Sequence, residues 1–437
     1  MTTPDHLQHQ EELHQIFERI EHSEDHIFIT GKAGTGKSTL LSYIRRHTHK
    51  KTVVLAPTGV AALNVRGQTI HSFFKFKPRF QDINAIKQKK RKSKLYGSLE
   101  LLIIDEISMV RADVFDAIER FLCLNGPTPG LPFGGVQVCV VGDLFQLPPV
   151  VSGAERELYQ QHYTSAFFFS SHAYKKAGFA VLELHKIFRQ LDNDFIRMLN
   201  IIRQGRVNPE TIGRINSQVG ADVGDHAVIL TSTNALAERT NQAQLEALNT
   251  KAYTYVASQE GAMTRASGNM PAPEELVLKE GAHVMLTRND PKRRWVNGTL
   301  AIVSSLTPVS VEVQITKDGR NRHYTIEQEE WESIEYKVNE ESGVISENVV
   351  GVYRQYPLIH AWAITIHKSQ GKTIDEIVID LGSGAFAAGQ LYVALSRCPS
   401  LERISLVSPI TAADVRADPI VNKFYDYYQE KMKKLSA

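Results

Sequence analysis

A glycine-rich stretch, GKAGTGKST at residues 31–39, has the residue types and spacing that bind a phosphate group. It fits the P-loop pattern G-x-x-x-x-G-K-[ST], in which backbone N–H groups point inward and the following helix adds a positive dipole. Lys37 is expected to reach the β- and γ-phosphates, and the Ser38 hydroxyl to bind Mg²⁺. The stretch therefore predicts a nucleoside triphosphate site, lined by Gly34, Thr35, Gly36, Lys37, Ser38 and Thr39.

Two adjacent acids, Asp105 and Glu106, close the apolar run 101–104 in the segment SLELLIIDEISMV. A P-loop needs a carboxylate at such a strand end to hold its metal ion. Asp105 is expected to hold Mg²⁺, and Glu106 to orient and deprotonate the attacking water. Adjacent acids are common on protein surfaces, but an apolar run that ends in two acids downstream of a P-loop is not. The pair favours hydrolysis over transfer to a bound acceptor.

Alternating strand and helix patterns position these groups. HIFIT, before the P-loop, is typical of a buried strand, and KSTLLSYIRRH, after it, is typical of the start of a helix. Near-continuous apolar runs, expected in strands that are buried on both faces of a parallel sheet, lie at 51–58, 99–106, 136–143 and 179–184. The pattern predicts an α/β fold with one doubly wound domain over about residues 1–185.

A second set of strands begins at HAVILTST, residues 226–233, and resumes with AWAITIHKSQG, DEIVIDL, GQLYVALSRC and RISLVS. Between them, about residues 299–355 carry short alternating strands with turn signals at Asn297-Gly298 and Asp318-Gly319. We predict a small antiparallel β-barrel inserted into a second domain. That second domain would comprise residues 186–298 and 356–437.

The lysine-rich run KQKKRKSK, at 87–94, lies in a small basic insertion at about 75–98. It is either a solvated loop or an arm that contacts phosphates, and the sequence leaves both open. The formal net charge is only +2, so a nucleic-acid partner would have to be met by local basic patches.

The composition is that of a soluble globular protein, with 42% hydrophobic and 22% charged residues. No run approaches the ~20 apolar residues of a membrane span, and the polar N-terminus resembles neither a secretory signal nor a transit peptide. Cys123, Cys139 and Cys398 are better explained as thiols in a reducing compartment than as a disulfide framework. We expect a cytoplasmic protein that does not contact a membrane.

Six blocks resemble, in sequence and order, the petite-integration-frequency (PIF) family of superfamily-one DNA helicases, with RecD-type helicases next. The resemblance spans about residues 25–408, and its blocks are APTGVAALNVRGQTIHSFF, IIDEISMV, VGDLFQLPPV, LELHKIFRQ, WAITIHKSQG and LYVALSRC. It implies two RecA-like domains with ATP and Mg²⁺ between them, an SH3-like form for the inserted barrel, and DNA running across both domains.

The resemblance also implies roles for residues outside the P-loop. Gln146 would lie near the γ-phosphate and report its loss, and Gly371 would line the nucleotide. Arg189 and Arg397 would be arginine fingers that stabilise charge on the transferred phosphoryl group. A surface ion pair is the plainer interpretation of either arginine. With fingers on one domain and the P-loop on the other, ATP would close the cleft and hydrolysis would open it.

The DNA contacts implied by the resemblance are Thr58, His71 and Phe73 in the first domain and Thr365 and His367 in the second. Hydroxyls and imidazoles can bond phosphates, and a phenylalanine offers a stacking face. Phe73 is equally well explained as a core residue. For Lys368, which follows His367, the sequence does not decide between touching phosphate and closing the loop.

A glutamine ahead of the P-loop often reads the adenine edge in this family. Gln8, Gln10 and Gln15 are candidates, and their spacing to the P-loop is longer than usual. Gln10 is favoured because it places residues 13, 16 and 17 on one helix face. The strictness of the preference for ATP is left open.

The resulting hypothesis is a monomeric ATP-dependent DNA helicase that moves 5′ to 3′ along single-stranded DNA, a polarity that rests on the resemblance alone. Duplex junctions are expected partners and G-quadruplexes a further candidate, and the family's roles lie in DNA replication, repair, recombination and telomere maintenance. Two alternatives are a DNA-stimulated ATPase that clamps or remodels DNA without processive unwinding, and the motor subunit of a nuclease machine.

Overall fold

A six-stranded parallel sheet carries the P-loop at the end of one of its central strands. The computed structural model describes residues 4–436 except 90–93, 191, 225–226, 262–269, 271, 293, 318–319 and 339–344. The strand order is β3-β2-β4-β5-β1-β6, and every neighbouring pair is parallel. The strands are β1 (Ile27–Gly31), β2 (Thr52–Ala56), β3 (Gln68–Thr69), β4 (Leu101–Ile104), β5 (Gln137–Gly142) and β6 (Ala180–Leu184). The predicted α/β fold is confirmed.

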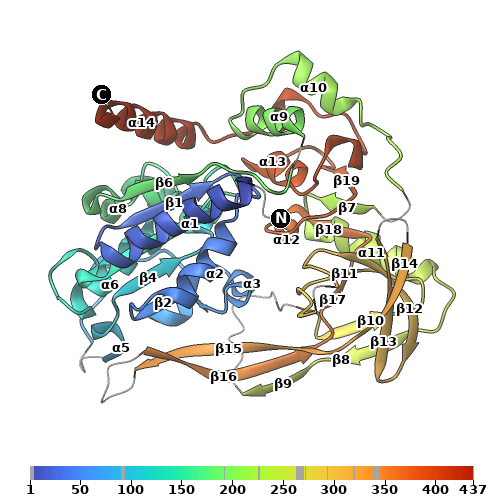
Figure 1. The fold of residues 1–437 in the computed structure, drawn as a ribbon, viewed down its shortest axis with the longest axis horizontal. Coiled ribbons are helices and arrows are strands. Elements are labelled where there is room, and N and C mark those ends of the chain that lie inside the picture. Colours follow the sequence, from blue (N-terminus) through green and yellow to red (C-terminus); the bar gives the residue numbers. More distant parts are fainter. Residues whose placement is uncertain are drawn as a thin grey trace.

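Helices cover both faces of this sheet because its strands are apolar on both sides (Figure 1). Helices α1 and α2 pack on one face through a cluster that includes Ile20, Leu40 and Ile44. On the other face, Phe115 of α6 lies in a larger core with strand residues such as Phe28. The helices of this part are α1 (Pro4–His22), α2 (Lys37–His47), α3 (Gly59–Asn64), α4 (Ile70–Phe74), α5 (Lys94–Gly97), α6 (Ala112–Asn125), α7 (Arg156–His162) and α8 (His172–Ala177).

A second, four-stranded parallel sheet has the order β18-β7-β19-β20. The predicted strand 226–233 appears as β7 over 228–231, and residue 226 lies outside the described residues. Its strands are β7 (Val228–Thr231), β18 (Ala363–Thr365), β19 (Ile377–Asp380) and β20 (Ile404–Leu406). The helices of this part are α9 (Asn193–Arg203), α10 (Pro209–Asn216), α11 (Asn234–Ala247), α12 (Ile366–Ser369), α13 (Gln390–Leu395) and α14 (Pro419–Ser436).

The segment expected to form the barrel contributes to two antiparallel sheets. A five-stranded sheet, β14-β13-β12-β11-β17, encloses its own apolar core and includes β11 and β17 from outside 299–355. A three-stranded sheet, β15-β16-β9, carries a long hairpin, and β10 pairs with β8. The predicted turn at Asp318-Gly319 lies outside the described residues. The strands are β8 (Tyr253–Val256), β9 (Ser258–Gly261), β10 (Glu275–Leu278), β11 (His283–Leu286), β12 (Leu300–Thr307), β13 (Ser310–Lys317), β14 (Arg320–Ile326), β15 (Glu329–Val338), β16 (Ile345–Gln355) and β17 (Leu358–His360).

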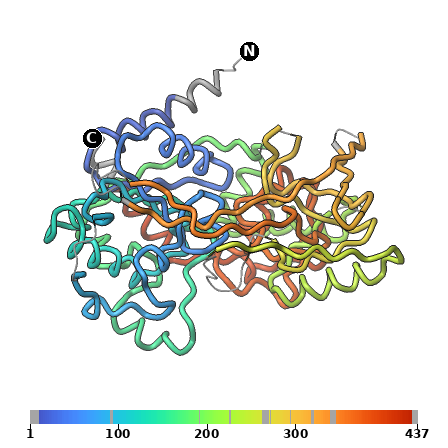
Figure 2. The backbone as a smooth tube through the Cα atoms, turned by 90° about the horizontal axis from the view of Figure 1, so that it is seen from below, coloured from blue at the N-terminus to red at the C-terminus, as the bar shows by residue number. Residues whose placement is uncertain are grey.

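The β15–β16 hairpin reaches from this region to the first sheet, where it runs alongside α3 and α5 (Figures 1 and 2). The Tyr336 hydroxyl accepts a hydrogen bond from Val54 N at 3.2 Å and lies 3.3 Å from Val54 O. Arg45 pairs with Glu347, and Lys75 with Glu335 at 3.3 Å. These contacts join two parts of the chain that are nearly 300 residues apart. Among the described residues, no helix is both long and apolar enough to cross a membrane.

We predict that Tyr336→Phe loosens this docking. The variant removes a hydroxyl that serves both backbone groups of Val54, so unfolding is expected to become easier by about 1–3 kcal/mol. Hydrogen exchange at the Val54 amide should become faster. Urea unfolding and amide exchange measured by mass spectrometry check both expectations.

Tyr353→Phe is the matched control, because the Tyr353 hydroxyl donates to Ala272 O at 2.9 Å within the same half of the chain. It should lower stability by a similar amount without changing exchange at Val54. Equal exchange at Val54 in both variants and the wild type would contradict the proposed role of the Tyr336 hydroxyl.

Candidate nucleotide site

The P-loop joins the carboxyl end of β1 to the amino end of α2. Gly36 precedes the helix with φ 87°, a left-handed backbone conformation that residues other than glycine rarely adopt. Thr35 is buried, and its hydroxyl donates to Lys32 O at 2.9 Å. Ser38 and Thr39 are exposed in the first turn of α2. The backbone is therefore shaped as an anion-binding turn that leads directly into a helix N-terminus.

Lys37 points back into this turn. Its Nζ donates to Gly31 O at 2.7 Å and to Lys32 O at 2.9 Å. Burial lowers the pKa of Lys37, while the carboxylates of Asp143 and Glu106 act in the opposite direction. The ammonium group thus lies within the field of the acids that follow the neighbouring strands.

The two predicted acids lie directly after β4. Glu106 has φ 49°, a left-handed conformation that costs a residue with a side chain about 1–2 kcal/mol. Burial, followed by the charge of Asp105, raises the pKa of Glu106 to about 7. Burial also raises the pKa of Asp105. A carboxyl group with a pKa near neutrality is suited to accept a proton from water.

Gln370 connects the acid to the second half of the chain. Its Nε2 donates to Glu106 Oε2 at 3.1 Å and to Gln146 Oε1 at 2.9 Å. Gln146, which the sequence predicts near the γ-phosphate, is buried at this contact. Sequence reasoning missed Gln370, although it directly precedes Gly371 in the block WAITIHKSQG. Three separate blocks therefore meet at one side-chain amide.

Arg189 lies against the P-loop. A Cβ added to Gly34 would lie 2.7 Å from Arg189 Cβ, so the two backbones approach closely because position 34 is a glycine. The guanidinium donates to Thr373 Oγ1 at 2.9 Å, Ser396 O at 3.1 Å and Gly371 O at 3.3 Å. Burial lowers the pKa of Arg189 to about 10, so the group stays charged at neutral pH.

Arg397 is fully buried close by. Burial, together with the charge of Arg189, lowers its pKa to about 9, and Glu106 contributes in the opposite direction. Its guanidinium donates to the backbone carbonyls of Val393, Ser369 and Lys372 and to the Ser396 hydroxyl. The two predicted fingers are thus neighbours, and both are held by hydrogen bonds to residues 369–373 and 393–396.

Comparison with known proteins decides the family. The family described as PIF1-like helicase matches residues 7–212. The chain is 32% identical over 417 residues to the ATP-dependent DNA helicase Pif1 of Bdellovibrio bacteriovorus, an alignment that covers 93% of this chain and 89% of that protein. The chain belongs to the PIF1-like helicase family.

Other family members agree in sequence and in fold. The chain is 34% identical to human ATP-dependent DNA helicase PIF1 over 91% of its own length, and it spans 60% of that longer protein. The crystal structure of Bacteroides Pif1 with ADP-AlF4 matches with a TM-score of 0.88 at 36% identity, covering 96% of this chain and 97% of the other. Bacteroides Pif1 bound to single-stranded DNA matches over the same shares with a TM-score of 0.68.

The donors expected for Mg²⁺ in a PIF1-like helicase are chemically suitable here. Ser38 offers a hydroxyl in the first turn of α2, and Asp105 offers a carboxylate after β4. Hard oxygen donors of these two types are those that Mg²⁺ prefers, with water and phosphate oxygens completing its shell. The side chain of Gln10, the expected adenine reader, lies outside the described residues.

The expected DNA contacts follow strands of both parallel sheets. The Thr58 hydroxyl accepts from Ala61 N at the start of α3, and the buried Thr365 hydroxyl accepts from Lys368 N at the start of α12. His367 and Lys368 are exposed in α12. His71, in α4, is half-buried, and burial lowers its pKa, with a smaller contribution from Arg111.

Phe73 has the position of a core residue. Only 3% of it is exposed, and its ring makes edge contacts with Phe74, Tyr96 and Tyr336 at centroid distances of 4.9, 5.4 and 6.0 Å. Of the two interpretations that the sequence leaves open, this packing supports the core one, because the ring presents no face to a base.

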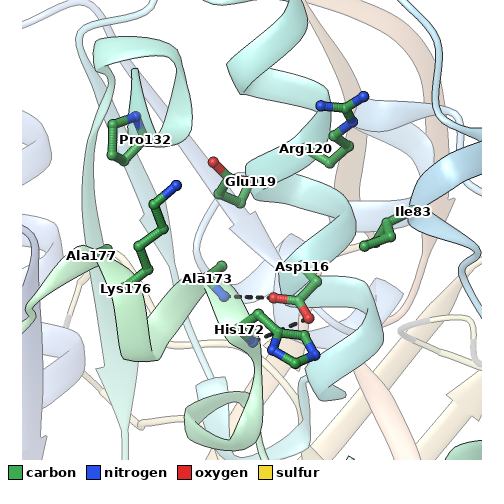
Figure 3. A pocket seen from close by; sticks show the side chains of 9 residues that line it. All are labelled: Ile83, Asp116, Glu119, Arg120, Pro132, His172, Ala173, Lys176 and Ala177. Atoms are coloured by element: carbon green, nitrogen blue, oxygen red, sulfur yellow. Dashed lines mark hydrogen bonds between the residues drawn. The ribbon is translucent and has the colours of Figure 1, made fainter. Parts of the chain in front are cut away.

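A pocket of about 210 Å³ lies between α6 and α8, and none of its residues belongs to the blocks above (Figure 3). Its most buried acid, Asp116, accepts hydrogen bonds from the Tyr163 hydroxyl and from the amides of His172 and Ala173. That carboxylate therefore holds the start of α8. The lining residues are Ile83, Asp116, Glu119, Arg120, Pro132, His172, Ala173, Lys176 and Ala177.

We predict that ATP turnover depends on the protonation of Glu106. With a pKa of about 7, the fraction of Glu106 that can act as a base rises with pH, so kcat should rise by up to about tenfold from pH 6 to pH 8. Bound Mg²⁺ would offset the charge of Asp105, which places the midpoint at or below pH 7. The measurement is kcat at saturating ATP and DNA between pH 5.5 and 8.5, with circular dichroism confirming that the fold persists. A flat profile would assign the base to another group.

Proposed function

We propose that the chain is an ATP-dependent DNA helicase that hydrolyses ATP between its two parallel-sheet regions and moves 5′ to 3′ along single-stranded DNA. The contact of Gln370 with both Glu106 and Gln146 carries this proposal. Gln370 lies just after α12, which the second sheet positions, whereas Glu106 and Gln146 follow strands of the first sheet. A change at the phosphate therefore acts on a contact between the two regions.

The chemistry assigned to each residue follows from its position. Lys37 would exchange its two carbonyl partners for phosphate oxygens. The exchange is favourable because an ammonium group makes stronger hydrogen bonds to charged oxygens than to neutral carbonyls. Glu106 would take a proton from water as the water oxygen bonds to the γ-phosphorus and the bond to the β-phosphate oxygen breaks. Mg²⁺, held by Ser38 and Asp105, would supply charge neutralisation at the phosphates.

The arginines would complete the site when the regions close. Arg189 already packs on Gly34 of the P-loop, and Arg397 lies beside it. Both donate mainly to neutral carbonyl and hydroxyl oxygens. Exchange of such partners for the charged γ-phosphate is favourable, because hydrogen bonds to ionised acceptors are roughly twice as strong. Loss of that phosphate would reverse the exchange and let the regions separate.

Glu106→Gln is expected to bind ATP and DNA but to hydrolyse about 10²–10⁴-fold more slowly, because the amide keeps the shape of the side chain and cannot accept the proton. Steady-state ATPase rates and equilibrium binding of a labelled oligonucleotide measure the two properties. Gln146→Glu is the comparison variant for both measurements. It changes the other partner of Gln370 and keeps Glu106 as the base. Normal turnover by Glu106→Gln would remove Glu106 from the mechanism.

A tailed-duplex assay tests the proposed activity and its polarity. A duplex with a 5′ single-stranded tail should be unwound faster than the same duplex with a 3′ tail. Lys37→Ala, which removes the phosphate-binding ammonium, is the inactive control. Faster unwinding of the 3′-tailed duplex would overturn the polarity, and DNA-stimulated ATP hydrolysis without unwinding of either would indicate a clamp.

A further inference from the structure

Two tyrosines from the second half of the chain reach the start of the P-loop at Thr30 and Ala33, which we call its root. Tyr392 of α13 is buried, and its hydroxyl accepts a hydrogen bond from Ala33 N at 3.1 Å. The same hydroxyl donates to Asp143 Oδ2 at 3.2 Å. Because Ala33 is the third residue of the glycine-rich stretch, Tyr392 holds a P-loop amide directly.

Tyr425, on the C-terminal helix α14, makes the second contact. Its hydroxyl lies 2.6 Å from the hydroxyl of Thr30, a fully buried residue next to the end of β1. Its ring stacks on Phe145 with a centroid distance of 5.1 Å and an interplanar angle of 11°. Figure 1 shows α14 extending from the second region across the end of the first, near β6 and α8.

A buried ion pair joins the two tyrosines. Arg203 of α9 donates to Asp143 Oδ1 at 2.9 Å, and its guanidinium lies 4.2 Å from the Phe145 ring centre and 5.6 Å from that of Tyr425. Burial acts to raise the pKa of Asp143, but Arg203 and Lys37 outweigh it, and the pKa lies below its ordinary value. Asp143 is therefore a charged acceptor, and it fixes the direction in which the Tyr392 hydroxyl points.

We propose that Tyr392 and Tyr425 are positioning residues, which set the P-loop for ATP only while the two regions are docked together. This inference rests on the proposed function. A phenylalanine at either position would fill the same space, so the hydroxyls serve the Ala33 amide, Asp143 and Thr30. Because α13 and α14 belong to the second half, separation of the regions would release the root of the P-loop.

Tyr428 provides a matched control on the same helix. Its hydroxyl lies 2.7 Å from the Tyr174 hydroxyl and donates to Phe179 O at 3.3 Å. These contacts also join α14 to the first half of the chain, but they are made with α8 and with the residue just before β6, away from the P-loop. Tyr428→Phe should therefore weaken the attachment of α14 and leave the P-loop in place.

The experiment compares Y392F, Y425F and Y428F with the wild type. An ATP analogue with a fluorescent N-methylanthraniloyl group reports nucleotide affinity, steady-state kinetics give KM and kcat, and thermal unfolding gives Tm. For Y392F, Kd and KM are expected to rise about tenfold, with a smaller change in kcat, since one buried hydrogen bond changes an equilibrium by up to about that factor. Y425F should raise them about threefold.

The control separates positioning from general stability. Y428F should lower Tm as much as Y425F while leaving Kd and KM unchanged. The inference is overturned if Y392F and Y425F bind the analogue as the wild type does, or if Y428F weakens binding equally.

The double variant Y392F/Y425F adds a test of coupling. Because both hydroxyls act on one loop, its effect should fall short of the product of the single effects. If the effects of Y392F and Y425F on Kd simply multiply in the double variant, the two hydroxyls do not act on the same loop. A wild-type chain that binds the analogue but unwinds no DNA would contradict the proposed function and leave this inference intact. Failure of the proposed function and failure of this inference are therefore distinguishable.

Discussion

Buried charge beside the P-loop is the interaction on which the other features of the site depend. Asp143 is buried, and Lys37, Asp105 and Glu106 are half-buried beside it. An unpaired buried ion costs several kcal/mol. The structure resolves this by neighbouring charges of opposite sign, with Arg203 paired to Asp143 at 2.9 Å. Part of the neutralising charge therefore comes from the second half of the chain. The nucleotide site and the contact between the two regions are consequently one electrostatic unit.

Sheet topology brings these charges together. The central strands β4, β5 and β1 are neighbours and run parallel, so their carboxyl ends meet at one edge. Asp105 follows β4, Asp143 follows β5, and the P-loop follows β1. Ligands in open α/β sheets bind at such an edge because loops rather than side chains of the strands are available there. An apolar run followed by an acid is a local pattern, and the strand order is what places that acid beside the P-loop.

The sequence predicted the parts of the site whose chemistry is written in short, contiguous patterns. The P-loop, the acid pair and the strands that carry them are of this kind, and the predicted strands β2, β4, β5 and β6 lie where the apolar runs are. Gln370 and Tyr392 were missed because a glutamine or tyrosine has no characteristic spacing. Their importance follows only from tertiary contacts with Glu106 and Ala33. Phe73 was ambiguous for the same reason, since its packing against Tyr336 depends on a hairpin that is about 260 residues distant.

The extent of the inserted region was also beyond local patterns. Alternating strands were recognisable, but the pairing of β11 with both β12 and β17 depends on contacts across the whole insertion. The hairpin β15–β16 leaves that sheet because its Tyr336 and Glu347 find partners on the first half of the chain. Period-two alternation specifies a strand and its faces, but it does not specify which sheet receives the strand.

One local pattern recurs in both halves and suggests how a DNA strand could be held across them. Thr69-Ile70-His71 and Thr365-Ile366-His367 each place a threonine that caps a short helix, with the histidine at the second helical position. Burial lowers the pKa of both histidines, and His71 also lies in the field of Arg111. The same local arrangement would thus offer one imidazole beside each parallel sheet as a partner for a DNA phosphate.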